Sequence, residues 1–142
     1  MTSKTKRSLL AWAAGAAAVV GLAACGREKP SEAPALSGAA LGEREYRSCA
    51  ICHASAPPGT PAGDARLVGP TLWGVYGQPA ARLDGYAYST AMREADLIWD
   101  AATLDAFIAN PQAVVRGTRM SYAGEPNPEK RAAIIEYLKT LQ

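Results

Sequence analysis

Three residues with reactive side chains lie close together in the segment CAICH at 49–53, namely Cys49, Cys52 and His53. Cysteines three positions apart on a helix lie on one face, about one turn apart. Their thiols can therefore reach the two vinyl groups of one porphyrin, and His53 can turn its imidazole toward the iron. This is the spacing of c-type haem attachment. The segment predicts one covalent haem with His53 as an axial ligand.

Other chemistries use cysteines at this spacing, and each needs further features in the chain. A redox-active dithiol is typical of a thioredoxin-like strand–helix pattern, which is missing around Cys49 and Cys52. A zinc site needs more ligands, but the chain has three cysteines and His53 is its single histidine. A plain Cys49–Cys52 disulfide in a structural protein without haem is the third alternative.

The segments around these residues carry helical patterns. Ala39, Gly42, Tyr46 and Cys49 recur at steps of three and four, which places them on one face of a helix beginning near residue 38. We find no sustained alternation of apolar and polar residues, so no sheet is expected. The fold class is therefore predicted to be all-α, with short helices and long loops rich in proline and glycine.

Capping residues indicate where three further helices begin. Ser89 suits the N-cap of a short helix, and Asp100 suits the N-cap of another that ends at Asn110 and the proline after it. Asn127 suits the start of the last helix. The residues expected to face the core of the last two helices are Leu104, Phe107, Ile108, Ala133, Ile134, Tyr137, Leu138 and Leu141.

A domain of this size, built from short helices and long loops, would have a thin apolar core by itself. A buried haem would supply the missing apolar centre. We therefore expect the chain to fold poorly without the cofactor.

Residues 41–142 resemble class I cytochrome c, a family whose short helices and loops surround one covalent haem. The haem motif and the GTRM segment are specific in combination. The resemblance is carried by Trp99 and by GEREYRSCAICH at 42–53, GPTLWG at 69–74, DGYAYSTAM at 84–92, NPQAVVRGTRM at 110–120 and IIEYLKTL at 134–141.

The resemblance implies a second axial ligand on the iron, and Met92 and Met120 are the candidates of the common ligand types. Met120 ends the segment Gly117-Thr118-Arg119-Met120, which resembles the distal-ligand loop of the family. Met92 lies on an expected short helix, where a core methionine is the ordinary interpretation. Met120 is therefore the preferred ligand, and its soft thioether would raise the reduction potential.

Other positions take roles that the resemblance implies. Pro70 resembles the proline whose carbonyl accepts a hydrogen bond from the proximal imidazole, and Leu72 resembles a residue that packs on the haem. Tyr88 and Trp99 resemble the donors to a buried haem propionate, with simple core packing as the alternative. Gly42 and Tyr46 on the first helix are expected to cross the last helix at Ile134 and Tyr137.

The chain departs from the family at several positions near the expected site. Phe107 replaces a common tyrosine, so it has no hydroxyl for the Met120 sulfur, and Met92 replaces a polar residue. Arg116 replaces a proline before Gly117, and Gln78 replaces a common arginine. Arg82 is a candidate to take over the charge of that arginine near a propionate. These changes indicate a softer ligand loop.

The first residues of the chain have the pattern of an export signal. Lys4, Lys6 and Arg7 precede the apolar run Leu9–Leu22, which is too short to span a bilayer comfortably. The run ends in Leu22-Ala23-Ala24-Cys25, which resembles the lipobox of bacterial lipoproteins. Residues 1–24 are therefore predicted to be a signal peptide of the lipoprotein type, with Cys25 as the lipidated residue.

Residues 25–40 are rich in proline, alanine, serine and glutamate, and they are expected to form a flexible tether before the cytochrome c domain at 41–142. Three of the 15 basic residues belong to the signal peptide, which leaves 12 against 13 acidic residues and a net charge of −1. This balance gives no reason to expect a nucleic-acid partner. A monomer is the default expectation.

The function that follows is one-electron transfer at the periplasmic face of a bacterial membrane, without enzymatic activity. The resemblance implies redox partners such as a quinol–cytochrome c reductase, a terminal oxidase or a dehydrogenase. The alternative is a gas sensor or a peroxidase-like enzyme, in which a labile Met120 exposes the iron to ligands.

Overall fold

The computed structural model describes residues 36–142. Two long loops, at 49–89 and 115–127, join the helices and contribute to the lining of a central cavity. Helix α1 (Gly38–Glu45) continues into the short 3₁₀ helix η1 (Tyr46–Ser48), and α5 (Pro128–Thr140) ends the fold. Between them lie α2 (Thr90–Arg93), α3 (Ala101–Ala109) and α4 (Pro111–Val114). The signal peptide, Cys25 and most of the expected tether lie outside the described residues.

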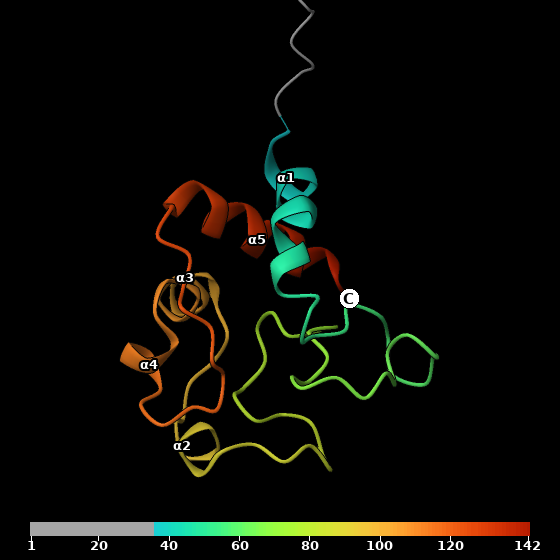
Figure 1. Ribbon diagram of the computed structural model, residues 1–142, viewed down its shortest axis with the longest axis vertical. Helices are drawn as coiled ribbons and strands as arrows, with labels where there is room; N and C mark the ends of the chain where they lie inside the picture. The colour runs from blue at the N-terminus through green and yellow to red at the C-terminus, as the bar shows by residue number, and fades with distance from the viewer. Residues whose placement is uncertain (1–35) are drawn as a thin grey trace, which may run out of the picture. The chain divides into compact units, whose positions relative to one another are not determined.

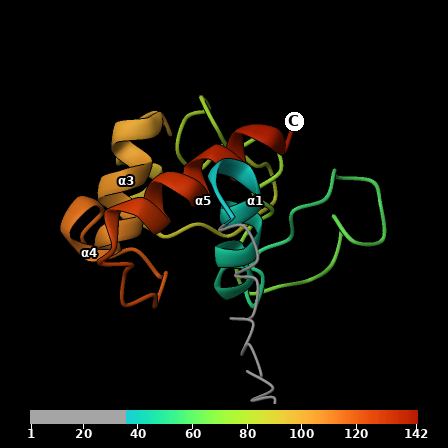
Figure 2. The same cartoon turned by 90° about the horizontal axis from the view of Figure 1, so that it is seen from above.

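Helices α1 and α5 cross each other, and α3 packs against α5 (Figure 1). In the second view the loop that follows η1 extends to the side away from α3 and α4 (Figure 2). Apart from an isolated bridge between Pro79 and Ile98, no β-structure occurs in residues 36–142. The predicted all-α fold is confirmed. None of the helices in this part of the chain is long and apolar enough to cross a membrane.

The crossing of α1 and α5 depends on close backbone contact at Gly42. A Cβ atom at this position would lie 1.9 Å from the carbonyl oxygen of Ala133 and 2.7 Å from Cβ of Tyr137. One turn further along, the rings of Tyr46 and Tyr137 pack with centroids 5.1 Å apart. The expected contact between the first and last helices is therefore confirmed.

Tyr46 also connects this crossing to the segment after the two cysteines. Its hydroxyl donates to the carbonyl oxygens of His53 at 3.1 Å and Ala54 at 3.2 Å. Burial raises the pKa of Tyr46, so the hydroxyl remains protonated and able to donate. The α1–α5 pair thus fixes the backbone on which His53 lies.

Side-chain caps begin the later helices as the sequence indicates. Oγ of Ser89 accepts from the N–H of Met92 at 3.1 Å, and Oδ1 of Asp100 accepts from the N–H of Thr103 at 2.8 Å. Asn127 caps α5 through the N–H of Glu129 at 2.8 Å.

One short helix was not expected from the sequence. Asn110 ends α3, but its Oδ1 also accepts from the N–H of Ala113 at 3.1 Å, and Pro111 takes the first position of α4. Proline is well suited to that position because its missing N–H would have no partner there. The Asn110-Pro111 pair therefore ends one helix and begins the next.

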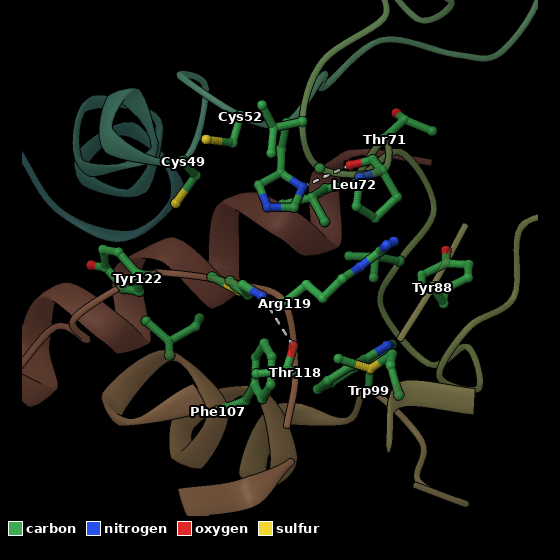
Figure 3. Close-up of a pocket in the computed structure, with 18 of the residues that line it drawn as sticks. Cys49, Cys52, Thr71, Leu72, Tyr88, Trp99, Phe107, Thr118, Arg119 and Tyr122 are labelled. Atoms are coloured by element: carbon green, nitrogen blue, oxygen red, sulfur yellow. Dashed lines mark hydrogen bonds between the residues drawn. The ribbon is translucent and has the colours of Figure 1, made fainter. Parts of the chain in front are cut away.

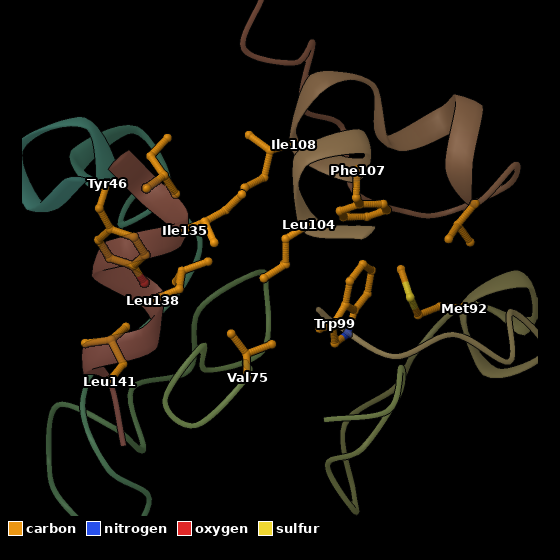
Figure 4. Close-up of a cluster of buried hydrophobic side chains, with 12 residues drawn as sticks. Tyr46, Val75, Met92, Trp99, Leu104, Phe107, Ile108, Ile135, Leu138 and Leu141 are labelled. Carbon is orange, nitrogen blue, oxygen red and sulfur yellow. The ribbon is translucent and has the colours of Figure 1, made fainter. Parts of the chain in front are cut away.

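The described core lies between α3, α5 and the loop that contains Val75 (Figure 4). Ile134 is 2% exposed and Ile135 is 4% exposed, so α5 buries one more isoleucine than its predicted apolar stripe contains. Met92 is buried and belongs to the same cluster, in agreement with its expected place in the core. The remaining buried members are Tyr46, Trp99, Leu104, Phe107, Ile108, Val115, Leu138 and Leu141.

Candidate functional site

A cavity of about 630 Å³ lies in the middle of the fold, within the range of about 300–1,000 Å³ that is usual for small-molecule sites. Figure 3 shows Cys49 and Cys52 on one side of this cavity and Phe107 and Trp99 on the other. Apolar side chains form much of the lining, including Leu72, Val75, Leu104, Ile108, Ile134 and Leu138. The cavity is therefore suited to a large apolar group.

The two cysteines belong to a tight turn that follows η1. The N–H groups of Cys52 and His53 both donate to the carbonyl oxygen of Cys49, at 3.0 and 2.9 Å. Both thiols are free and half-buried, and both line the cavity. Burial raises the pKa of the Cys49 thiol, with the Ser48 hydroxyl opposing this effect. A thiol held in its protonated form does not suit a redox-active dithiol, whose chemistry needs a thiolate.

His53 is oriented by a single hydrogen bond. Its Nδ1 lies 2.7 Å from the carbonyl oxygen of Pro70. Because a carbonyl can only accept, Nδ1 carries the proton and Nε2 keeps its lone pair free. Burial lowers the pKa of His53, while the bond to Pro70 opposes this effect. The neutral imidazole therefore offers a metal-ligating nitrogen in the lining of the cavity.

Gly69 makes room for this imidazole, a role that was not predicted from the sequence. A Cβ atom on Gly69 would lie 2.3 Å from Cε1 of His53 and 2.6 Å from its Nδ1. The N–H of Gly69 donates to the carbonyl oxygen of Cys52 at 2.8 Å, which holds the two segments together. The only signal in the sequence was the glycine's place immediately before Pro70.

Both candidate methionines line the cavity. Met92 is buried at 9% exposure beside Trp99 and Phe107 (Figure 4), whereas Met120 is half-buried on the loop that follows α4. The N–H of Met120 lies 3.3 Å from Oγ1 of Thr118, a buried polar side chain at 8% exposure.

The other residues implied by the resemblance also line the cavity, namely Pro70, Leu72, Tyr88 and Trp99. Trp99 packs on Phe107 with ring centroids 4.8 Å apart. Burial raises the pKa of Tyr88, and this effect is opposed by a hydrogen bond from Leu83 and by the charge of Arg82. Figure 3 shows Tyr88 and Trp99 away from the two cysteines.

Two guanidinium groups, those of Arg82 and Arg119, belong to the described lining, which includes no carboxylate. Arg82 also donates to the carbonyl oxygen of Trp73. A cofactor with an apolar ring, two vinyl groups and two carboxylates matches this combination of apolar walls, thiols and cations. The residues therefore fit a covalent haem. In contrast, no group of three His, Cys, Asp or Glu side chains able to hold a metal ion occurs among residues 36–142.

No protein-family model matches the chain. The chain is 42% identical over 99 residues to cytochrome c2 of Rhodomicrobium vannielii, which covers 70% of this chain and 75% of that protein. It is 40% identical to cytochrome c2 of Rhodopila globiformis, with 66% of this chain and 83% of that protein covered.

A solved structure of a cytochrome c also resembles the chain. Cytochrome cH from Methylobacterium extorquens matches with a TM-score of 0.64 and 40% identity, over 73% of this chain and 99% of that one. Likeness of sequence and of fold thus extends over most of the length of these relatives. The chain belongs to the family of monohaem cytochromes c, which are electron carriers rather than enzymes and hold one covalent haem c.

Proposed function

We propose that this cytochrome is a lipid-anchored one-electron carrier, in which Cys49 and Cys52 attach the haem while His53 and Met120 ligate its iron. The observation that carries the proposal is the common cavity. Both thiols, the imidazole and the Met120 side chain all line it, and the bond from His53 to Pro70 leaves Nε2 free. With His53 and Met120 both holding the iron, no position would remain open for a substrate.

Each side chain has a distinct part in this function. Cys49 and Cys52 retain the haem by covalent bonds, and the Pro70 carbonyl holds His53 in the tautomer that can ligate. When bound, the haem supplies the one-electron couple of its iron. Met120 contributes a soft thioether that favours the reduced state and raises the potential. Leu72 and the other apolar lining residues exclude water from the site.

The polar side chains that line the cavity have a further role, toward the haem carboxylates. We assign Tyr88 and Trp99 as donors to the haem carboxylates, with Arg82 as a nearby positive charge. The support is that all three line the cavity and that the charge of Arg82 acts on Tyr88. Tyr88 and Trp99 also lie away from the cysteines that would bond the vinyl groups (Figure 3).

The proposed location depends on residues outside the described part of the chain. We assign residues 1–24 as a signal peptide of the lipoprotein type, Cys25 as the lipidated residue and the residues between Cys25 and the start of α1 as a tether. α1 begins at Gly38, so residues 38–40 are already helical. A Cys25→Ser variant should leave the membrane fraction and appear in the soluble periplasmic fraction.

The tether would hold the domain near redox complexes on the periplasmic face of a bacterial membrane. Candidate partners are a quinol–cytochrome c reductase, a terminal oxidase or a dehydrogenase. Two or more acyl chains would give a stable anchor, whereas a single chain would bind only marginally.

The axial ligand is tested by visible spectra of the holoprotein, oxidised and reduced, with CO added to the reduced form. Because both methionines line the cavity, Met120→Leu and Met92→Leu form a matched pair with nearly unchanged volume. We expect Met120→Leu alone to lose the weak far-red band of Met-to-iron ligation and to bind CO rapidly. Loss of that band in Met92→Leu instead would assign Met92 as the ligand. Rapid CO binding by the unaltered protein would favour a gas sensor or a peroxidase-like enzyme.

A further inference from the structure

The side-chain amide of Gln112, in α4, bonds to two points on the loop that leads to Met120. Its Nε2 donates to the carbonyl oxygen of Thr118 at 2.9 Å. Its Oε1 accepts from the N–H of Gly117 at 3.1 Å. One planar amide therefore satisfies a donor and an acceptor on neighbouring residues of the loop.

These two bonds continue through Thr118 to the backbone of Met120. The N–H of Thr118 donates to the carbonyl oxygen of Val115 at 3.0 Å, which closes a turn around Gly117. Gly117 has a φ of 92°, a conformation that other residues rarely adopt. Oγ1 of Thr118 in turn accepts from the N–H of Met120 at 3.3 Å.

The helix that carries Gln112 is held in place by buried residues, although the Gln112 side chain itself is exposed. The prolyl ring of Pro111 is fully buried, and Val115 is 3% exposed, so the two ends of α4 are held in the core. The Asn110 cap adds a further restraint on its first turn. Substitution of Gln112 therefore removes the bonds to the loop and leaves the packing of α4 intact.

We propose that Gln112 is a positioning residue that restrains the loop from Arg116 to Met120 and so slows the departure of Met120 from the iron. This inference rests on the proposed function, in which Met120 is the ligand. Without the amide, the bond from the N–H of Thr118 to Val115 would be the one described hydrogen bond that still joins Gly117 and Thr118 to the residues before the loop. Since an amide carries no charge, the restraint is independent of ionic strength, unlike one that a lysine or arginine would provide.

Ligand exchange in the ferric holoprotein measures this restraint. Imidazole binds the iron only after Met120 has left, so its observed rate levels off at the rate of loop opening as its concentration rises. We expect Gln112→Ala to increase this limiting rate about tenfold, because opening no longer breaks the two bonds to the amide. Gln112→Glu keeps the acceptor for Gly117 but loses the donor to Thr118, so its rate should lie between the two.

Gln142→Ala is the matched control, because the Gln142 side chain is also exposed and also donates to a backbone carbonyl, that of Lys139 at 2.9 Å, but lies outside the loop. It should leave the limiting rate unchanged. An equal rate in Gln112→Ala and the unaltered protein, with saturation in both, would overturn the role of Gln112 alone. A lower denaturation midpoint without a faster rate would also overturn it, since the residue would then only stabilise the fold. Binding that never saturates in the unaltered protein would instead contradict Met120 as the ligand.

Discussion

At the scale of single residues, the proximal side of the cavity depends on the absence of a side chain at Gly69. The His53 ring lies where a Cβ atom would be, and its Nδ1 bonds to Pro70 beside it. The orientation of the imidazole therefore depends on Gly69, which forms no bond to it, as well as on the hydrogen bond to Pro70. The contact can fix the ring because the hydrogen bond from the N–H of Gly69 to Cys52 holds the backbone at Gly69 close to the backbone at His53.

We expect Gly69→Ala to turn the imidazole and to break its bond to Pro70. Overpacking of this size costs roughly 1–3 kcal/mol of the free energy of unfolding. Followed by NMR, the Nδ1 proton should exchange slowly in the unaltered holoprotein, where it is bonded to Pro70, and rapidly in the variant. Val68→Ala is the control, because Val68 is 81% exposed. Slow exchange in Gly69→Ala would show that the backbone accommodates the methyl group without moving His53.

At the scale of helices, the α1–α5 crossing transmits its geometry to the haem-binding segment through Tyr46. α5 is joined to α3 by the ion pair of Arg131 and Asp105, at 2.8 Å. The Arg131 guanidinium also donates to the carbonyl oxygens of Glu125 and Pro126, at 3.0 and 2.9 Å. Thus α5 contacts α1 and α3.

Gly42→Ala should separate α1 from α5, because the new Cβ would overlap the Ala133 carbonyl oxygen. Displacement of rigid backbone costs more than displacement of a flexible side chain, so a loss of about 3 kcal/mol is expected, at the upper end for overpacking. Denaturant unfolding of the holoprotein measures it. Glu43→Ala, an exposed change on the same helix, should stay within about 0.5 kcal/mol of the unaltered protein. Equal stabilities of these two variants would contradict the close crossing.

The cap of α3 gives a prediction about pH. Hydrogen bonds from Thr103 hold the pKa of the Asp100 carboxyl below its ordinary value of 3.8. A lowered pKa in the folded state means that the carboxylate stabilises the fold above about pH 4. This stabilisation is lost as the pH falls through the lowered pKa.

Asp100→Asn keeps a capping oxygen and has no charge to titrate. Its stability should therefore vary less with pH between neutral and acidic conditions than that of the unaltered protein. Asp100→Ala should be the least stable of the three at pH 7, since it has no acceptor for the Thr103 N–H. Thermal unfolding at several pH values distinguishes them, and parallel curves for Asp100→Asn and the unaltered protein would refute the assignment.

At the scale of the whole molecule, the haem replaces much of the core that short helices cannot build. Without an occupant, the apolar lining of this cavity of about 630 Å³ would face water or lack packing partners, and either condition destabilises a fold. We therefore expect the fold to depend on its cofactor.

The chain with Cys49 and Cys52 both changed to Ser should consequently lack cooperative unfolding when it is prepared without haem. Near-UV circular dichroism should show little fixed packing around Trp99, and heat should produce no sharp transition. The single variant Cys49→Ser, which keeps one thiol for attachment, is the comparison. A sharp thermal transition in the haem-free double variant would show that the helices form a sufficient core by themselves.

Local chemistry, which depends on neighbours within about four residues, could be predicted from the sequence. The haem-attachment spacing of Cys49, Cys52 and His53, the caps at Ser89, Asp100 and Asn127 and the absence of alternating strands all belong to this class. α4 was not predicted although its signal is local, because Asn110 and Pro111 fit the end of α3 equally well. Pro70 and Met120 came from family resemblance rather than from spacing.

Only the tertiary structure decided which distant residues meet. The space for His53 at Gly69, the ion pair of Arg131 with Asp105 and the burial of Met92 beside Trp99 all join segments separated by loops. The chain between such residues can follow many paths, so no periodicity in the sequence encodes their contact. Packing selects one path because close backbone approach and hydrogen-bond pairing must be satisfied together in a single compact arrangement.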